Sequence, residues 1–257
     1  MYTFYMKYAA FLITCIFINC SFPPVKLEKA PQNRAKFMEP RTVRIIVEGR
    51  EVREKFRGKW KELGWGTGTI LYSSDEFSLV QTANHVLFDP KKRGLINVEI
   101  RFILEKRNLA NEIVELYWGA EIAERFVEID LGLLRIDENL GVHTHLAKKT
   151  TIGDPIYTLG YPYVPGMSAP TISYAHGYIA SRGIYIPEYG NTIRTVAFQD
   201  RGASGSAFYN WRGEIVGIVS MGYGKYGIPY YGAFYGTYAE EMREAYATSR
   251  YKEYLLR

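Results

Sequence analysis

Short segments with strand character follow one another along most of this chain, and this succession restricts the fold more than any other feature. The segments are rich in Val, Ile, Thr and Tyr, and Gly, Pro and Asn separate them. Such spacing is typical of all-β sandwiches and barrels, whereas an α/β fold alternates strands with helical stretches. We expect strands near residues 42–47, 66–71, 78–82, 98–104, 113–118, 131–136, 155–159, 171–181, 192–197, 205–209 and 214–220.

The end of the chain has a different periodicity. Between residues 238 and 256, apolar and aromatic side chains recur at spacings of three and four, which places them on one face of a helix. We therefore expect a C-terminal α-helix over residues 239–257. This helix can either pack on the β-structure or present its apolar face to a partner.

The composition is that of a globular protein. Hydrophobic residues make up 47% of the 257 residues, and the net charge of +5 is too small to indicate nucleic acid by itself. Lys and Arg exceed Glu between residues 26 and 61, which fits either a solvated arm or contact with an anionic partner such as lipid headgroups. We expect no nucleic-acid partner, no cofactor and no metal ion.

Residues 1–20 have the pattern of an export signal. Lys7 precedes an apolar run at residues 9–18, which is too short for a membrane-spanning helix and suits the core of a signal peptide. Residues 17–21 loosely resemble a bacterial lipobox, in which Cys20 is lipidated after cleavage, although Asn19 replaces the usual small residue. A plain cleaved signal and an uncleaved membrane anchor are the alternatives.

The segment that follows is expected to be a tether over residues 21–41, because it is polar and contains a Pro pair. Cys15 and Cys20 are the only cysteines, so the folded body contains no disulfide. These features predict an exported protein of the bacterial cell envelope or periplasm. If Cys20 is lipidated, the protein is a lipoprotein held at the membrane.

Three separate positions have the residue types of a nucleophilic site. Ser204 lies between glycines at residues 202–205, and a serine needs a base and an orienting acid to act as a nucleophile. His85 follows an apolar strand, and Asp130 opens another. Taken alone, the histidine could be structural and the aspartate could be a strand-end cap.

The order of these three residues along the chain is informative. His85, Asp130 and Ser204 occur in the order of the chymotrypsin-type triad, which differs from that of subtilisin and of the α/β-hydrolases. The Gly-x-Ser-x-Gly pentad of an α/β-hydrolase is absent around Ser204. An esterase of that class is therefore a distant alternative.

The surrounding motifs make the chain resemble a trypsin-like serine protease with the chymotrypsin fold, closest to the HtrA/DegP-type protease domain. The resemblance covers residues 42–238. The chain ends soon after this region, so we expect no PDZ domain. The motifs are residues 82–86 around the histidine, 130–134 around the aspartate and 202–207 around the serine, with supporting segments at residues 66–68, 152–162 and 213–218.

This resemblance implies two six-stranded antiparallel β-barrels and a serine endopeptidase that acts through an acyl-enzyme intermediate. Ser204 would be the nucleophile, His85 the general base and Asp130 the group that orients it. The backbone N–H groups of Gly202 and Ser204 would form the oxyanion hole. A polypeptide is the implied substrate.

The resemblance also assigns residues that would contact the substrate. Ser220, Met221 and Gly222 would form the edge strand that pairs with the substrate backbone. Phe198 would lie near the base of the primary specificity pocket, which favours small or aliphatic residues before the cut. The alternative is that Phe198 points into the barrel.

Two positions of the serine motif depart from the family pattern. Ser206 replaces a glycine, and Ala203 occupies a position that is usually polar. Neither change removes a group that the reaction requires. The departures nevertheless support an alternative, a catalytically silent envelope binding protein built on a protease fold.

Overall fold

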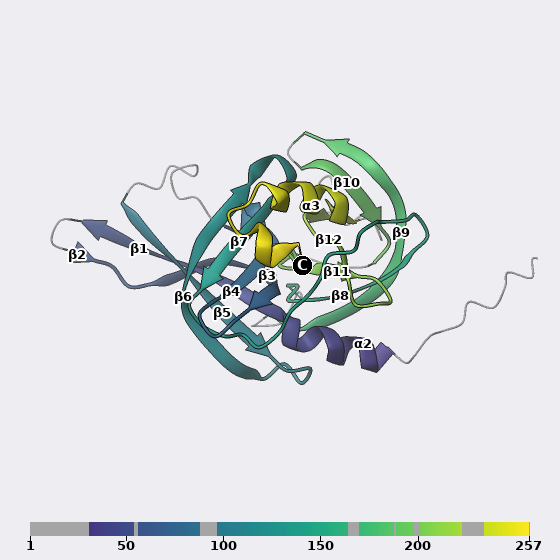
Figure 1. The fold of residues 1–257 in the computed structure, drawn as a ribbon. Helices are drawn as coiled ribbons and strands as arrows, with labels where there is room; N and C mark the ends of the chain where they lie inside the picture. Colours follow the sequence, from purple (N-terminus) through teal and green to yellow (C-terminus); the bar gives the residue numbers. More distant parts are fainter. Residues whose placement is uncertain are drawn as a thin grey trace, which may run out of the picture. The chain divides into compact units, whose positions relative to one another are not determined.

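The structure is a computed structural model that describes residues 31–53, 56–87, 97–163, 170–187, 189–197, 201–222 and 234–256. The chain divides into two units, Met1–Pro31 and Gln32–Arg257, and apart from Pro31 at the start of α2 the second contains the elements of Figure 1 that are described below. Cys20 and Phe198 lie outside the described residues. Within the described ranges, no helix is both long and apolar enough to cross a membrane.

The first sheet closes on itself. Its strand order is β2-β1-β3-β4-β7-β6-β5, and β1 also pairs with β5, so that all its strands except β2 form a ring of antiparallel strands (Figure 1). Val43, Ile45 and Val47 alternate along β1 and fill the ring, because successive strand residues point to opposite faces. The strands are β1 Thr42–Arg53, β2 Phe56–Arg57, β3 Lys61–Ser73, β4 Ser78–Ala83, β5 Val98–Arg107, β6 Ile113–Phe126 and β7 Leu131–Ile136.

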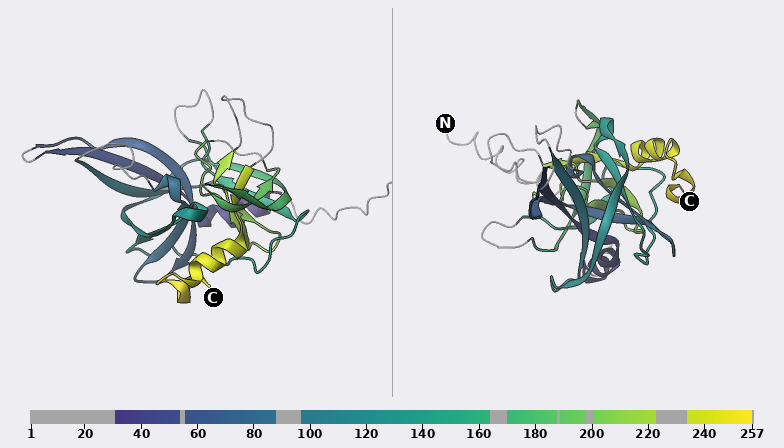
Figure 2. Two further views of the ribbon diagram at one scale, coloured as in Figure 1. Left: turned by 90° about the horizontal axis from the view of Figure 1, so that it is seen from above. Right: turned by 90° about the vertical axis from the view of Figure 1, so that its left-hand side faces the viewer.

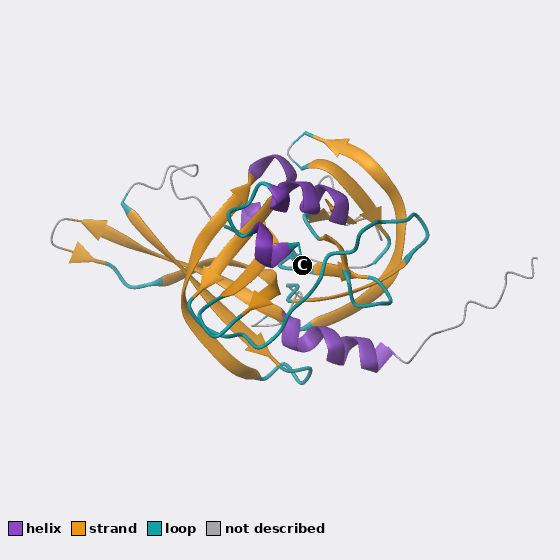
Figure 3. Cartoon of the chain, viewed as in Figure 1, coloured by secondary structure: helices purple, strands orange, loops and turns teal. Residues whose placement is uncertain are grey.

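The second sheet is also antiparallel, with the order β12-β11-β8-β9-β10-β14-β13. It forms a half-barrel, in which a single bridge between Gly217 and Tyr238 links β12 to the residue after β14. The predicted two-barrel fold is confirmed, with one barrel closed and the other partly open (Figure 3). The strands are β8 Pro155–Gly160, β9 Ser173–Ile186, β10 Gly190–Thr195, β11 Ala207–Tyr209, β12 Ile215–Ile218, β13 Met221–Gly222 and β14 Phe234–Thr237.

A helix within the expected tether packs on the second sheet. Helix α2 spans Pro31–Met38 and is followed by the 3-10 helix η1 at Glu39–Arg41. The Phe37 ring lies edge-on to Tyr209 at 6.1 Å, and Met38 is buried in the core. These two apolar side chains interrupt the polar stretch, and their burial binds the second half of the segment to the domain.

The C-terminal helix forms as predicted but is divided in two (Figure 2). Helix α3 spans Ala239–Ala247, and helix α4 spans Lys252–Leu255. Between them, Thr248 Oγ1 donates to the Ala245 carbonyl, and Ser249 Oγ accepts the N–H of Tyr251. Such side-chain bonds compete with helix hydrogen bonds, which explains the interruption.

Helix α3 also ties the C-terminus to the first sheet. Tyr246 is fully buried, and its hydroxyl donates to Gln81 Oε1 on β4 at 3.1 Å. Burial raises the pKa of the Tyr246 hydroxyl, so the group stays protonated and remains a donor. Because β4 leads directly to His85, this bond supports the strand that carries the histidine.

We predict that Tyr246→Phe lowers the free energy of unfolding by about 1–3 kcal/mol, since it leaves the buried Gln81 oxygen without a donor. Urea denaturation measures this change. Tyr185→Phe is the control, because Tyr185 is 69% exposed and should change the stability by no more than about 0.5 kcal/mol. Equal stability of the two variants would contradict the prediction.

Candidate active site

His85 lies in the 3-10 helix η2, Asn84–Val86, immediately after the fully buried strand β4. The N–H of Asn84 donates to the Asp130 carbonyl at 2.9 Å, which fixes the start of this turn. The imidazole is 43% exposed. The sequence therefore places a histidine at a rigid strand end with one side of its ring open to solvent.

Asp130 follows the 3-10 helix η4, Val127–Ile129, and has a left-handed backbone with φ +50°. Its carboxylate accepts two hydrogen bonds from His85, Oδ1 from the backbone N–H at 2.9 Å and Oδ2 from ring Nδ1 at 2.8 Å. An ionised carboxylate only accepts, so the proton lies on Nδ1. This arrangement leaves Nε2 of His85 as the acceptor that a general base needs.

The loop that contains Ser204 depends on glycines on both sides of the serine. Gly202 has φ +90° and Gly205 has φ +88°. A Cβ at Gly202 would lie 2.6 Å from the Tyr161 carbonyl oxygen, and one at Gly205 would collide with Thr67 and Thr82. Both the backbone torsion and the lack of space therefore require glycine.

This loop docks on the first sheet beside His85. The Thr67 N–H of β3 donates to the Ser204 carbonyl at 2.8 Å. A Cβ at Gly66 would lie 3.1 Å from the same carbonyl and 2.5 Å from the side chain of Val86, the residue after His85. The fold thus brings the serine loop next to the turn that carries the His85–Asp130 pair.

The structure joins two of the three predicted catalytic residues directly. His85 and Asp130 are hydrogen-bonded, whereas the Ser204 hydroxyl donates no hydrogen bond to the imidazole in the part of the chain that is described. The backbone N–H groups of Gly202 and Ser204, the predicted oxyanion donors, likewise donate to no other described residue.

Comparison with known proteins identifies the family. A model of the trypsin-like peptidase domain matches residues 66–218. The chain belongs to this family. No curated protein sequence matches it.

Solved structures share the fold of this trypsin-like peptidase domain. The serine endoprotease from Yersinia pestis has 19% identity and a TM-score of 0.60, with 85% of this chain and 66% of that chain covered. The HtrA-type protease AlgW with decapeptide has 19% identity and a TM-score of 0.64, with 84% and 66% covered. This chain thus spans slightly less than two thirds of the length of these solved chains.

The two side chains that depart from the family pattern lie in the interior of the trypsin-like domain. Ala203 and Ser206 are both fully buried. Ser206 Oγ lies against Gly160, where an added Cβ would collide with it, and has no hydrogen-bond partner among the described residues. Neither side chain therefore reaches the open side of the His85 ring.

The predicted substrate strand lies at the edge of the second sheet. Strand β13, which consists of Met221 and Gly222, pairs with β14 and ends the strand order. Ser220 is buried, and its N–H donates to the Tyr235 carbonyl at 3.0 Å. Among the described residues, no strand pairs with the outer edge of β13.

Sequence reasoning missed the residues that support the serine loop. Trp65 Nε1 donates to the Tyr161 carbonyl at 3.0 Å beside Gly202, and Thr67 contacts both Gly202 and Ser204. Burial raises the pKa of the Tyr161 hydroxyl, which keeps it neutral. The sequence pointed to Trp65, Thr67 and Tyr161 only through their position in or next to two motif segments, residues 66–68 and 152–162.

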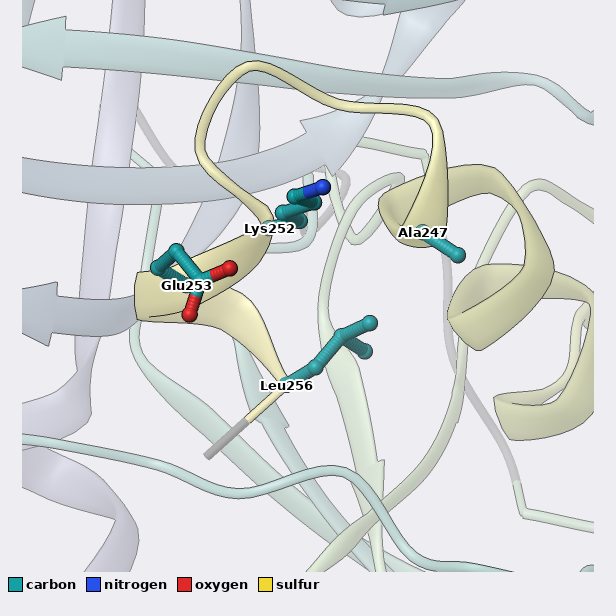
Figure 4. Close-up of a pocket in the computed structure, with 4 residues that line it drawn as sticks. All are labelled: Ala247, Lys252, Glu253 and Leu256. Atoms are coloured by element: carbon teal, nitrogen blue, oxygen red, sulfur yellow. The ribbon is translucent and has the colours of Figure 1, made fainter.

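The structure also contains a pocket at the C-terminal helices. A pocket at the end of α3 and along α4 is lined by Ala247, Lys252, Glu253 and Leu256 (Figure 4). It includes none of the predicted site residues. Among the described residues, no group of three or more His, Cys, Asp or Glu side chains could hold a metal ion.

We predict that Ser206→Ala raises the free energy of unfolding by about 1 kcal/mol, because it removes a buried hydroxyl that has no hydrogen-bond partner in the described ranges. Gly160→Ala should instead lower it by about 1–3 kcal/mol, because the new methyl group collides with Ser206 Oγ. Chemical denaturation of both variants measures the two changes. A clear loss of stability in Ser206→Ala would mean that its hydroxyl has a partner after all.

Proposed function

We propose that this chain is a serine endopeptidase whose catalytic triad consists of His85, Asp130 and Ser204. The observation that carries the proposal is the paired hydrogen bonding of the Asp130 carboxylate to the backbone and ring of His85. Membership of the trypsin-like peptidase domain family and the docking of the serine loop beside His85 support it. The solved AlgW structure contains a decapeptide, and a polypeptide is the substrate proposed for this chain.

In this mechanism, Ser204 Oγ attacks the scissile carbonyl while His85 Nε2 takes its proton. The Asp130 carboxylate stabilises the imidazolium, which then gives the proton to the leaving amine. Water hydrolyses the acyl-enzyme by the same route. The N–H groups of Gly202 and Ser204 stabilise the oxyanion, and each such donor contributes about 2.7–4 kcal/mol in well-studied cases.

The proposed substrate lies as an extended strand along the outer edge of β13. Ser220, Met221 and Gly222 would supply this edge, which is the end of the second sheet. Phe198 is proposed to close the primary specificity pocket and to favour small or aliphatic side chains before the cut. A peptide library profiled with the purified chain tests this preference.

We predict that Ser204→Ala abolishes covalent labelling by a fluorophosphonate probe. Asp130→Asn should lower the labelling rate constant by about 10⁴-fold, because the amide stabilises the wrong imidazole tautomer. Asn tolerates the left-handed backbone of residue 130, so this variant should keep its fold. Gel fluorescence against time measures both rates, and circular dichroism verifies the fold.

The control for specific reaction is Ser206→Ala, which removes the neighbouring hydroxyl of the same loop and should label at the wild-type rate. Labelling of Ser204→Ala at the wild-type rate would overturn the proposal. A wild-type chain that is folded but unreactive would instead favour the second candidate function.

That second candidate is a catalytically silent envelope binding protein. It is favoured by the lack of a hydrogen bond between the Ser204 hydroxyl and the His85 ring within the described part of the chain. Such separations also occur in active enzymes without substrate, where the bond tightens on binding. The labelling experiment therefore decides between the two functions.

We also propose that the protein is exported to the cell envelope and lipidated on Cys20. The apolar run at residues 9–18 and the lipobox-like residues 17–21 support this proposal. In a bacterial host, Cys20→Ser should abolish palmitate incorporation and release the protein from membranes. Cys15→Ser is the matched control and should retain both, whereas absence of palmitate from the wild type would favour a plain cleaved signal.

A further inference from the structure

The two residues predicted to donate the oxyanion-hole N–H groups share one partner, Thr67. The Thr67 hydroxyl donates to the Gly202 carbonyl at 2.9 Å. The Thr67 backbone N–H donates to the Ser204 carbonyl at 2.8 Å. One residue of the first sheet therefore holds both residues through their carbonyl groups.

The Thr67 side chain is itself held on both sides. It is fully buried, and its hydroxyl oxygen accepts the N–H of Tyr161 at 3.0 Å while the hydroxyl proton goes to Gly202. A hydroxyl provides one donor and two acceptor positions, so this geometry leaves it little freedom to rotate. Valine has the same shape but neither function, and serine keeps both.

Thr67 also links the serine loop to the strand that leads to His85. Its carbonyl accepts the hydroxyl of Thr82 at 2.7 Å, and Thr82 lies near the end of β4. The serine loop and the strand that leads to His85 are thus both hydrogen-bonded to the same residue of β3. A shift at Thr67 would move the oxyanion donors relative to the base.

The peptides that supply the N–H groups are anchored at their other ends. The Arg201 carbonyl accepts from the Tyr163 N–H, and the Ala203 carbonyl accepts from the Ser206 N–H at 2.8 Å. In a planar trans peptide the C=O and N–H groups point in opposite directions, so holding one directs the other. Because Thr67 binds the carbonyls of Gly202 and Ser204, the carbonyls of residues 201–204 are all hydrogen-bonded.

We propose that Thr67 is a positioning residue that holds the Gly202 and Ser204 N–H groups in the geometry of the oxyanion hole. The inference rests on the proposed serine endopeptidase function and adds a residue that the triad does not include. Preorganised donors stabilise developing charge without reorganisation during the reaction, so their placement controls rate. Removing the Thr67 hydroxyl frees the Gly202 carbonyl and leaves the Tyr161 N–H without its acceptor.

The test compares Thr67→Val and Thr67→Ser with the wild-type full-length chain, using the rate constant and the final extent of fluorophosphonate labelling. Thr67→Val should lower the rate constant by about 100-fold, as expected for a small misplacement of reacting groups. The final extent and the pH midpoint of labelling should stay at their wild-type values, because the His85–Asp130 pair is untouched. Thr67→Ser should keep most of the rate.

Thr144→Val is the matched control, because the Thr144 hydroxyl is also buried and donates to a backbone carbonyl, that of Ile70 at 2.8 Å. Thr144→Val should lose about as much free energy of unfolding as Thr67→Val, but it should be labelled at the wild-type rate. A wild-type rate in Thr67→Val would overturn the role of Thr67 while the proposed function stands. The role of Thr67 would also be overturned if Thr67→Val and Thr144→Val both showed a reduced labelling extent that is fully explained by a smaller fraction of folded protein.

A wild-type chain whose labelling does not depend on Ser204 would overturn the proposed function, and the role of Thr67 with it. The Ser204→Ala variant, measured in parallel, separates this outcome from the previous ones. Loss of rate in Thr67→Val with a full labelling extent, together with recovery in Thr67→Ser, is the result that only a positioning role predicts.

Discussion

The close approach of the serine loop to strand β3 is the constraint on which the rest of the site depends. Gly205 lies so near the backbone of Thr67 that no Cβ fits there, and its N–H donates to the Val219 carbonyl at 2.7 Å. The loop is therefore held between the two sheets. His85 follows β4 of the first sheet and β13 belongs to the second, so the loop lies in contact with both sheets that carry the candidate site.

The sequence indicated candidate residues for the site but not the residues that support them, and the reason is physical. His85 and Asp130 stand at strand ends, and their surroundings were visible as local apolar patterns. Thr67 and Tyr161 act through hydrogen bonds between residues far apart in the chain, which no local pattern encodes. The packing of α2 and the break after α3 were missed for the same reason, since tertiary contacts and side-chain bonds decided them.

Asp130 illustrates how a strained position can serve two purposes. Its left-handed backbone turns the chain sharply between η4 and β7, which brings both carboxylate oxygens to His85. Few residues other than glycine tolerate this torsion, but aspartate and asparagine do. Aspartate therefore suits this backbone and also provides the carboxylate that accepts two hydrogen bonds from His85.

The support of the serine loop extends into a buried ion network on the first sheet. Arg44 pairs with Glu105 at 3.5 Å, Glu105 pairs with Arg107 at 2.6 Å, and the Arg107 N–H donates to the Tyr161 hydroxyl. Buried ion pairs add little net stability compared with apolar packing, but removing one partner is costly. The network ends at Tyr161, whose N–H donates to the Thr67 hydroxyl.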